Sequence, residues 1–469
     1  MKDLIRFIKS TGIYLLGNVL SKSLSFFLLP LYTSYLSPND YGTYDLSIAY
    51  NTFLISILFL DIWEGTMRFM FDFSGKDRNK PITIGILMFS ISTGIYAIVL
   101  LIFGKIAGLQ FLGLLFIMGL INNFQQVVGY IARGFGKNSA FVMCGLIGSL
   151  VTLLSNIILL SVFKMDYSAL YISSILGLGI NALGLTIVIR LWERVKVKFF
   201  DSTLFHEMLR YSLPLCLNSG AWWFLNGFNR VMISQTLSSA DNGMYAVATR
   251  FSSMLMLITT GFQMAWQELS YSKVDASNEE KVKLYSRALN EYSKFLYLGL
   301  IALLPVIKII FPYFIDEKYA TALTIVPIAL YGTFFSSLTS FLASIINILK
   351  KNQFIFITTL MSALTNVFVL IILIKPLGVQ AATISLCAGY AVSFVARIKL
   401  VKKFVKLEIN LKQFLIYTLL FTITVIIFNF GSLLINILEL IGILVVFFMS
   451  YRTEIIKILS VKQKKTKND

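Results

Sequence analysis

The sequence predicts an all-α integral membrane protein with about 14 transmembrane helices, arranged as two six-helix lobes followed by two further helices. The first observation is composition: of 469 residues, 57% are hydrophobic and only 14% are charged, and the mean hydropathy is +0.79. The second is a series of apolar runs, each long enough to cross a bilayer. The third is a short motif that occurs twice. Together these observations exclude an ordinary soluble globular protein.

The repeated motif has the pattern L-S-x-x-D-x-G-x-Y. It occurs at residues 36–44 and again at residues 237–245, and each copy forms a polar turn between two apolar runs. We interpret it as a duplicated helical hairpin that opens two halves of one protein. Because each half contains an even number of runs, both halves enter the membrane from the same side, which predicts a parallel repeat about an axis along the membrane normal.

The apolar runs divide the chain into four predicted parts. The first lobe, residues 1–190, has runs near residues 11–36, 43–68, 82–103, 109–131, 140–163 and 168–190. A basic segment of mixed polarity, residues 191–210, is predicted to be a cytoplasmic linker at the membrane surface. The second lobe, residues 211–400, has runs near 211–237, 244–266, 292–313, 320–345, 353–374 and 378–399. Residues 401–469 add two runs, 412–429 and 433–450, and a basic tail.

Two local signals refine this division. The S-x-x-E pattern of residues 277–280 is a capping box, which predicts that a helix begins in the loop after residue 271. The first apolar run, residues 11–36, is too long for the hydrophobic region of a secretion signal and corresponds to the first run of the second lobe, so we interpret it as a transmembrane helix.

The net charge of +18 gives the orientation. If the N-terminus is cytoplasmic, most of the 41 Lys and Arg residues fall in cytoplasmic loops and helix ends. Those in the opposite loops are Lys105, Lys164, Lys308, Lys318 and Lys375. We therefore predict a multi-pass membrane protein with both termini in the cytoplasm, and we interpret the basic tail as a topology determinant rather than a nucleic-acid site.

Residues for metal or covalent chemistry are sparse. The single His206 and the three cysteines, Cys144, Cys216 and Cys387, are far apart in the sequence, and no spacing typical of a metal site or a disulfide framework is present. The sequence also lacks a nucleotide-binding loop and a nucleophile motif. We expect a protein that is not an enzyme and has no cofactor or metal.

Ionisable residues inside the apolar runs carry the functional information. A central Arg, Lys or Asp costs about 2.5–3.5 kcal/mol in a membrane helix, so each such residue must face a cavity or a partner. They are Lys22, Asp61, Glu64, Arg68, Arg230, Arg250 and Glu268. Asp61, Glu64 and Arg68 are spaced to lie on one helix face, and Asn18 stands one turn from Lys22.

Two interpretations of these charges are open. They pair with one another and hold helices together, for example Lys22 with Asp61 or Glu64; Arg68, near a helix end, can also snorkel to the surface. Alternatively, they line a wet cavity that binds an anion, because Arg230 and Arg250 have few obvious acidic partners in their own half. We predict substrate contacts from Lys22, Arg230, Arg250, Asn18, Asn229 and Gln125, and ion coupling or charge pairing by Asp61, Glu64, Arg68 and Glu268.

The sequence resembles the polysaccharide flippases (O-antigen and capsule repeat-unit exporters of the Wzx type), within the superfamily that also contains multidrug and toxin extruders and lipid II flippases. Residues 36–44 are similar to the family's L-S-P-x-x-Y-G-x-Y turn, and residues 65–69 to its G-x-x-R-F/Y. Tyr211, Pro214, residues 229–230 and residues 243–245 are similar to its Y-x-x-P, D-R and G-x-Y elements. One departure is Asn229, where family members commonly have Asp.

This resemblance implies a V-shaped pair of lobes that flips an undecaprenyl-pyrophosphate-linked oligosaccharide from the cytoplasmic to the outer leaflet by alternating access, for capsule, exopolysaccharide or O-antigen synthesis. Lys22, Arg230 and Arg250 would hold the two phosphates. An H⁺ or Na⁺ gradient would drive the motion, with Asp61 or Glu64 as carrier. Expected partners are membrane lipids, a polysaccharide polymerase and glycosyltransferases, with no nucleic acid, and the expected state is a monomer.

Three alternative functions remain open. The substrate can be lipid II or a teichoic-acid precursor instead, since about 14 helices also fit the lipid II branch. A cation-coupled multidrug extruder would need an acidic aromatic pocket, which the basic interior argues against. A non-transporting membrane scaffold is the third. The sugar, the coupling ion and the resting conformation are not given by the sequence.

Overall fold

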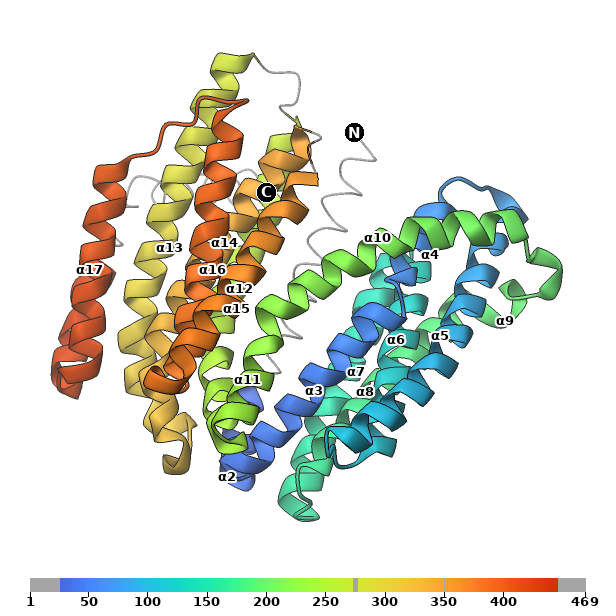
Figure 1. The fold of residues 1–469 in the computed structure, drawn as a ribbon, viewed down its shortest axis with the longest axis horizontal. Coiled ribbons are helices and arrows are strands. Elements are labelled where there is room, and N and C mark those ends of the chain that lie inside the picture. The colour runs from blue at the N-terminus through green and yellow to red at the C-terminus, as the bar shows by residue number, and fades with distance from the viewer. Residues whose placement is uncertain (1–25, 273–276, 350, 352, 446–469) are drawn as a thin grey trace, which may run out of the picture.

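The computed structural model describes residues 26–272, 277–349, 351 and 353–445, and every regular element in that part of the chain is helical. The helices form two groups that meet at one end and diverge toward the other, as a V (Figure 1). The all-α membrane architecture predicted from the sequence is confirmed. The first predicted run lies mostly outside the described residues, as does the basic tail.

The first lobe is formed by helices of the amino-terminal half (Figure 1). After α2 (Leu29–Tyr35), it comprises α3 (Pro38–Leu58), α4 (Ile62–Met70), α5 (Asn79–Ile106), α6 (Leu112–Gly134), α7 (Asn138–Ile157) and α8 (Ser168–Ile189). Short turns between them are η1 (Gly75–Arg78) and the π-helical η2 (Ile158–Val162). Then α9 (Leu191–Arg194) and η3 (Val197–Phe199) lead out of the lobe.

The second lobe contains the remaining long helices (Figure 1). They are α12 (Ser239–Ser272), α13 (Asn278–Phe314), η4 (Glu317–Ile325), α14 (Val326–Ile348), α15 (Gln353–Leu377), α16 (Gln380–Lys402) and α17 (Leu411–Phe430), followed by a shorter helix, Leu433–Val445. Helix α10 (Ser202–Asn226) crosses from the first lobe to the second, and α11 (Phe228–Thr236) leads into α12.

Nine helices of the described chain are long and apolar enough to span a membrane, or ten if α3 and α4 count as one bent span. Helix α12 is long enough but more polar, and α10 and α11 also lie outside this set. Each of the predicted apolar runs nevertheless coincides, at least in part, with a described helix.

The run at residues 43–68, expected as one helix, is broken in the structure. Leu60 and Asp61 have φ angles of +53° and +48°, and α3 and α4 differ in direction by 44°. Non-glycine residues are strained in this left-handed region, so two in succession interrupt the helix. The break places the Asp61 carboxylate at the beginning of a second helix.

The linker region is more helical than expected. Asp201 caps α10 by accepting hydrogen bonds from the backbone N–H groups of Thr203 and Leu204, so this helix begins within the segment expected as a linker. The predicted capping box is present, since Ser277 accepts from Glu280 N–H and Glu280 accepts from Ser277 N–H. The helix that begins there continues without interruption to Phe314, and so includes the next predicted span.

Candidate functional site: the seam between the lobes

The two copies of the repeated motif form the contact between the lobes. Ser37 accepts a hydrogen bond from Asp40 N–H (3.1 Å) and donates one to the Asp40 carboxylate (2.6 Å). Ser238 makes the equivalent pair with Asp241, at 3.0 and 2.6 Å. Each copy thus fixes the start of a helix, α3 in the first lobe and α12 in the second. We call the contact formed by residues 37–49 and 223–250 the inter-lobe seam.

Glycine permits the close crossing of α3 and α12. A Cβ atom on Gly42 would lie 1.7 Å from the carbonyl oxygen of Ser239, and one on Gly243 would lie 2.1 Å from that of Pro38. Gly42 corresponds to Gly243 in the repeat, and Pro38 to Ser239, so the two contacts are reciprocal. The shared spacing of the two motif copies therefore produces a pseudo-two-fold backbone contact that no larger residue can occupy.

A charged pair crosses the seam beside these glycines. The Arg230 Nε donates to the Asp45 carboxylate at 2.6 Å, with 23% and 12% of the two side chains exposed. Arg230 also donates to the carbonyl of Asn226 and lies 5.7 Å from the centre of the Tyr245 ring. The Asn242 amide donates to Gly42 O at 2.8 Å and lies 3.5 Å from Asp45. Arg230 therefore links α11 of one half to α3 of the other.

Arg250 joins this cluster from α12. It is half-buried and interacts electrostatically with Tyr41, with Tyr32 and with Asp45. It also lies within electrostatic range of Arg230. Two guanidinium groups thus share one carboxylate, which leaves an excess of one positive charge in this cluster. A partly buried positive excess is a favourable place for an anion.

Further hydrogen bonds close the same end of the molecule. Trp223 Nε1 donates to Ala49 O at 2.7 Å, which connects α10 to α3. Lys318 Nζ donates to Ser34 O at 3.1 Å, and the Tyr319 hydroxyl donates to Leu36 O at 3.2 Å. These contacts join η4 of the second lobe to the end of α2. The lobes are consequently held together at the end where the two motifs lie.

The acidic residues of the broken helix lie elsewhere. The Asp61 carboxylate accepts a hydrogen bond from Ser219 Oγ of α10 at 2.5 Å. Glu64 is exposed and interacts with Tyr130 and Arg133 of α6. Both acids face neighbouring helices of the bundle, and the structure does not join them to the Arg230 cluster.

Two predicted substrate contacts are buried within the lobes. Asn229 is fully buried, donates to Ala382 O at 2.8 Å and accepts from Asn366 Nδ2 at 2.8 Å. In this conformation its amide is hydrogen-bonded to α15 and α16. Gln125 is buried on α6 beside Gly129.

The other predicted residues are placed as follows. Arg68 forms an exposed ion pair with Asp72 at 2.6 Å, as a surface residue does. Glu268 lies on α12, and its side chain is outside the described part of the structure. Lys22 and Asn18 lie outside the described residues.

Sequence reasoning missed Asp45 and Asn242. Asp45 lies in the apolar run after the first motif, where an acid is as costly as those singled out at residues 61 and 64. A complete survey of ionisable residues in that run would have found it. Asn242 lies inside the second motif copy, at a position that the pattern leaves variable, so it carries no such signal.

Comparison with known proteins identifies the family to which the chain belongs. The family model described as "Polysaccharide biosynthesis protein" matches residues 7–267, more than half of the chain. The chain belongs to this family. The resemblance to polysaccharide flippases stated from the motifs is thereby confirmed.

Solved structures with the same fold are similar over most of the chain. The "Lipid II flippase MurJ, inward closed conformation" matches with a TM-score of 0.71 at 17% identity, covering 94% of this chain and 99% of that one. An inward-facing multidrug resistance MATE family transporter of the MOP superfamily matches with a TM-score of 0.67 at 14% identity, covering 86% and 95%. A mutant of the Vibrio cholerae MATE transporter VcmN matches with a TM-score of 0.53 at 12% identity, covering 85% and 97%. No curated protein matches the sequence. At these identities the structural matches show the fold alone.

Proposed function

We propose that this protein flips an undecaprenyl-pyrophosphate-linked oligosaccharide repeat unit from the cytoplasmic to the outer leaflet of the bacterial cell membrane. The observation that carries the proposal is the positive excess at the seam, where Arg230 and Arg250 share Asp45. A pyrophosphate is the anionic part of such a substrate, and the planar fork of arginine can bind two of its oxygens. Family membership supports the substrate class.

The seam also suggests how binding is coupled to movement. In our proposal both termini are cytoplasmic, in accordance with the positive-inside rule, so that the motif turns lie on the outer side and the closed end of this conformation faces outward. A pyrophosphate that binds Arg230 competes with Asp45 for the same N–H donors. Binding therefore weakens a contact that holds the lobes together, and a ligand shifts a conformational equilibrium through such a difference in affinity between states.

The lobes provide the route for the polar part of the substrate. Moving a bare pyrophosphate and its sugars through hydrocarbon is prohibitive, because each polar group that is buried without a hydrogen-bond partner costs about 2–7 kcal/mol. In our proposal the headgroup passes between the lobes, and the lipid tail stays in the bilayer. Lys22 is the third proposed phosphate ligand, and Asp61 or Glu64 the proposed carrier of a coupling H⁺ or Na⁺.

The test is flipping in proteoliposomes with a fluorescent lipid-linked oligosaccharide whose sugar is attacked by a membrane-impermeant reagent. We expect the double variant Arg230→Ala, Arg250→Ala to reduce the initial rate by at least about tenfold, because each lost charged hydrogen bond weakens binding by about 1.5–3 kcal/mol. Arg190→Ala is the matched control, since that arginine pairs with Glu193 on the surface. Normal flipping by the double variant, at normal protein abundance, would overturn the proposal.

A lipid II or teichoic-acid precursor is the second candidate substrate, favoured by the similarity to the MurJ fold. Both share the polyprenyl-linked phosphate chemistry, so the seam does not discriminate between them. Deletion in cells does: selective loss of capsule or exopolysaccharide supports the oligosaccharide, whereas general lysis supports lipid II. Proposed partners in the first case are the polymerase and the glycosyltransferases of the same pathway.

A further inference from the structure

A cavity of about 360 Å³ lies on the second lobe, between α13, α16 and α17. One wall is aromatic, formed by Tyr297, Phe394, Phe414 and Tyr417. The rings contact one another, with Tyr297 centred 5.4 Å from Phe414 and 5.9 Å from Tyr417. This cavity is separate from the inter-lobe seam and shares no residue with it. Its function is not explained by the proposed transport mechanism.

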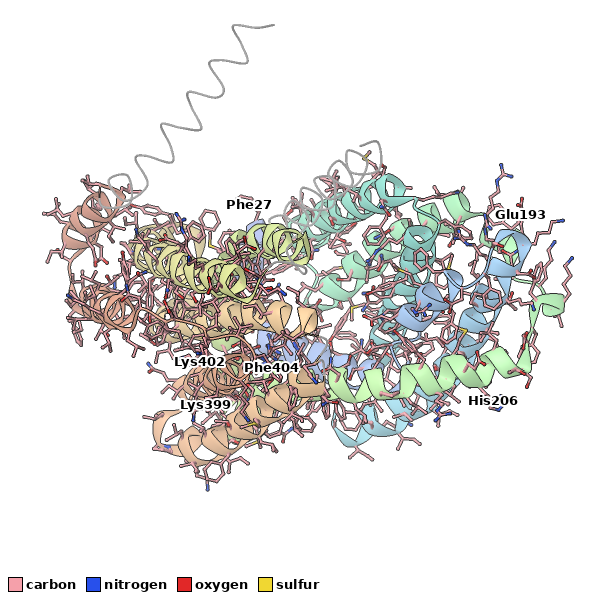
Figure 2. The ribbon with its side chains drawn as sticks, turned by 90° about the horizontal axis from the view of Figure 1, so that it is seen from above. Phe27, Glu193, His206, Lys399, Lys402 and Phe404 are labelled. Carbon is pink, nitrogen blue, oxygen red and sulfur yellow. The ribbon has the colours of Figure 1, made fainter. Side chains whose placement is uncertain are left out.

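The mouth of the cavity is basic. Lys399 and Lys402 belong to the last turn of α16, and Lys294 of α13 also lines the cavity. Figure 2 shows Lys399 and Lys402 near each other on the second lobe. Among the described residues that line the cavity, none is acidic. The site thus combines an apolar interior with cationic groups at one end.

Hydrogen bonds hold the mouth in shape. Asn290 of α13 donates from Nδ2 to Glu408 O at 3.1 Å and accepts from Asn410 N–H at 3.0 Å. Gln413 in turn donates to Asn290 O at 3.2 Å. These bonds fix the loop between α16 and α17 against α13. The cavity is therefore part of the packed structure rather than a gap between loosely placed helices.

The surroundings indicate what fills it. Leu411 of α17 is 67% exposed and Val395 of α16 is 49% exposed, so the exposed part of the lining is apolar as well as the interior. In a multi-pass membrane protein such a surface meets acyl chains. Helix ends mark the level of the lipid headgroups, where lysines bind phosphate. The lysines lie at the end of α16, beyond the aromatic wall, which matches the order of phosphate and acyl chain in a phospholipid.

We infer that this cavity binds an anionic glycerophospholipid of the surrounding bilayer, with its phosphate between Lys399 and Lys402 and an acyl chain against Tyr297, Phe394, Phe414 and Tyr417. The site is independent of the substrate path at the seam. Bound lipid would fasten α17 to α13 and α16, because it contacts all three helices. Headgroup charge, rather than headgroup structure, would determine selection, since the basic groups are lysines, which recognise phosphate as point charges.

The experiment is native mass spectrometry of the full chain in detergent, titrated with dioleoyl-phosphatidylglycerol or dioleoyl-phosphatidylcholine. The test variant is Lys399→Gln, Lys402→Gln. The matched control is Lys403→Gln, Lys406→Gln, which removes two exposed lysines of the same segment that do not line the cavity. We expect the test variant to bind phosphatidylglycerol about twenty- to thirty-fold more weakly, since each lysine near an anionic headgroup contributes roughly a factor of five. The control variant should bind as the natural chain does.

A second arm tests the apolar part and the source of the lipid. Val395→Trp, which fills the rim without changing charge, should weaken phosphatidylglycerol binding while leaving the thermal unfolding temperature unchanged. The inference would be overturned if both lysine variants lost affinity equally, or if phosphatidylcholine bound as well as phosphatidylglycerol. Displacement of phosphatidylglycerol from this cavity by equimolar undecaprenyl phosphate would assign the cavity to the transported lipid, and would likewise overturn it.

Discussion

Two arginines in the second half of the chain, Arg397 and Arg230, differ in the kind of acceptor that they bind and in where that acceptor lies. Arg397 of α16 is only 5% exposed and donates to Thr358 Oγ1 (2.9 Å), Thr339 O (2.8 Å) and Thr359 Oγ1 (3.1 Å). Its acceptors are all neutral and come from α14 and α15 of the same lobe. Arg230, by contrast, has a carboxylate partner, and that partner belongs to the other half of the chain.

This difference distinguishes hydrogen bonds that persist when the lobes move from an ion pair that an incoming anion can replace. The acceptors of Arg397 are fixed by the helices that carry them, and no competing ligand replaces several at once. The pair of Arg230 with Asp45 depends on one charge, which an incoming anion can replace. The interior of each lobe is therefore expected to move as a rigid body, and the seam to open and close.

The largest expected effect distinguishes the two arginines by the same substitution. We expect Arg397→Lys to lower the free energy of unfolding by about 3 kcal/mol or more, because a lysine reaches few of the acceptors while its charge stays buried. Arg230→Lys should lower it by less than about 1 kcal/mol, because a charge opposite Asp45 is retained. Thermal unfolding in detergent measures both. Equal losses in the two variants would contradict the comparison.

A smaller effect is expected from the glycine crossing. Gly42→Ala places a methyl group against the Ser239 carbonyl, and overpacking of this kind costs about 1–3 kcal/mol. Because the clash is between lobes, we expect the seam to open while each lobe stays folded. Spin labels at the exposed residues Asn39 and Thr236 would report the distance across the seam.

The control for that variant is Gly94→Ala in α5, where a Cβ atom meets nothing within 4 Å. It should leave the distance unchanged and raise stability by up to about 1 kcal/mol, since alanine favours a helix over glycine. An unchanged distance in Gly42→Ala, with a lower unfolding temperature, would show that the seam does not open separately from the lobes.

A double-mutant cycle measures the pair itself. Using Asp45→Asn and Arg230→Gln, we expect a coupling energy of about 1.5 kcal/mol in unfolding, as is found for close charge pairs. The same cycle between Asp45 and Arg397→Gln should give a coupling near zero, because those residues share no partner. A coupling of similar size in both cycles would show that the coupling does not arise from the contact between Arg230 and Asp45.

The sequence predicted the parts of this molecule that depend on local signals. Apolar runs located the helices, the repeated motif located both sides of the seam, and Ser277 with Glu280 located the start of α13. These features are encoded within a few residues of where they act. The predicted domain boundaries stay a prediction. The predicted roles of the site residues in binding do so as well.

The features that escaped prediction depend on distant contacts or on backbone strain. Asp45 and Arg230 are separated by 185 residues, and the packing of α11 against α3 brings them together. The hydrogen bonds of Asn229 to Asn366 and Ala382 likewise follow from packing within the lobe. The break at Asp61 requires positive φ angles at two non-glycine residues, for which the sequence has no signal.

The smallest expected effect concerns a contact that is neither inside a lobe nor at the seam. Asp201 caps α10 and lies 3.5 Å from Lys80 of α5. The backbone N–H of Leu204, and then Lys80, hold the pKa of this carboxyl below its ordinary value of 3.8. A lowered folded-state pKa means that the charged form stabilises the protein above the ordinary pKa, and that this contribution is lost as the pH falls through the lowered value.

Asp201→Asn keeps the capping oxygen but does not titrate. Its unfolding temperature should therefore lie slightly below that of the natural chain at pH 7 and converge with it in acid. A difference that stays the same as the pH falls through the lowered pKa would show that the charge of Asp201 does not stabilise this junction.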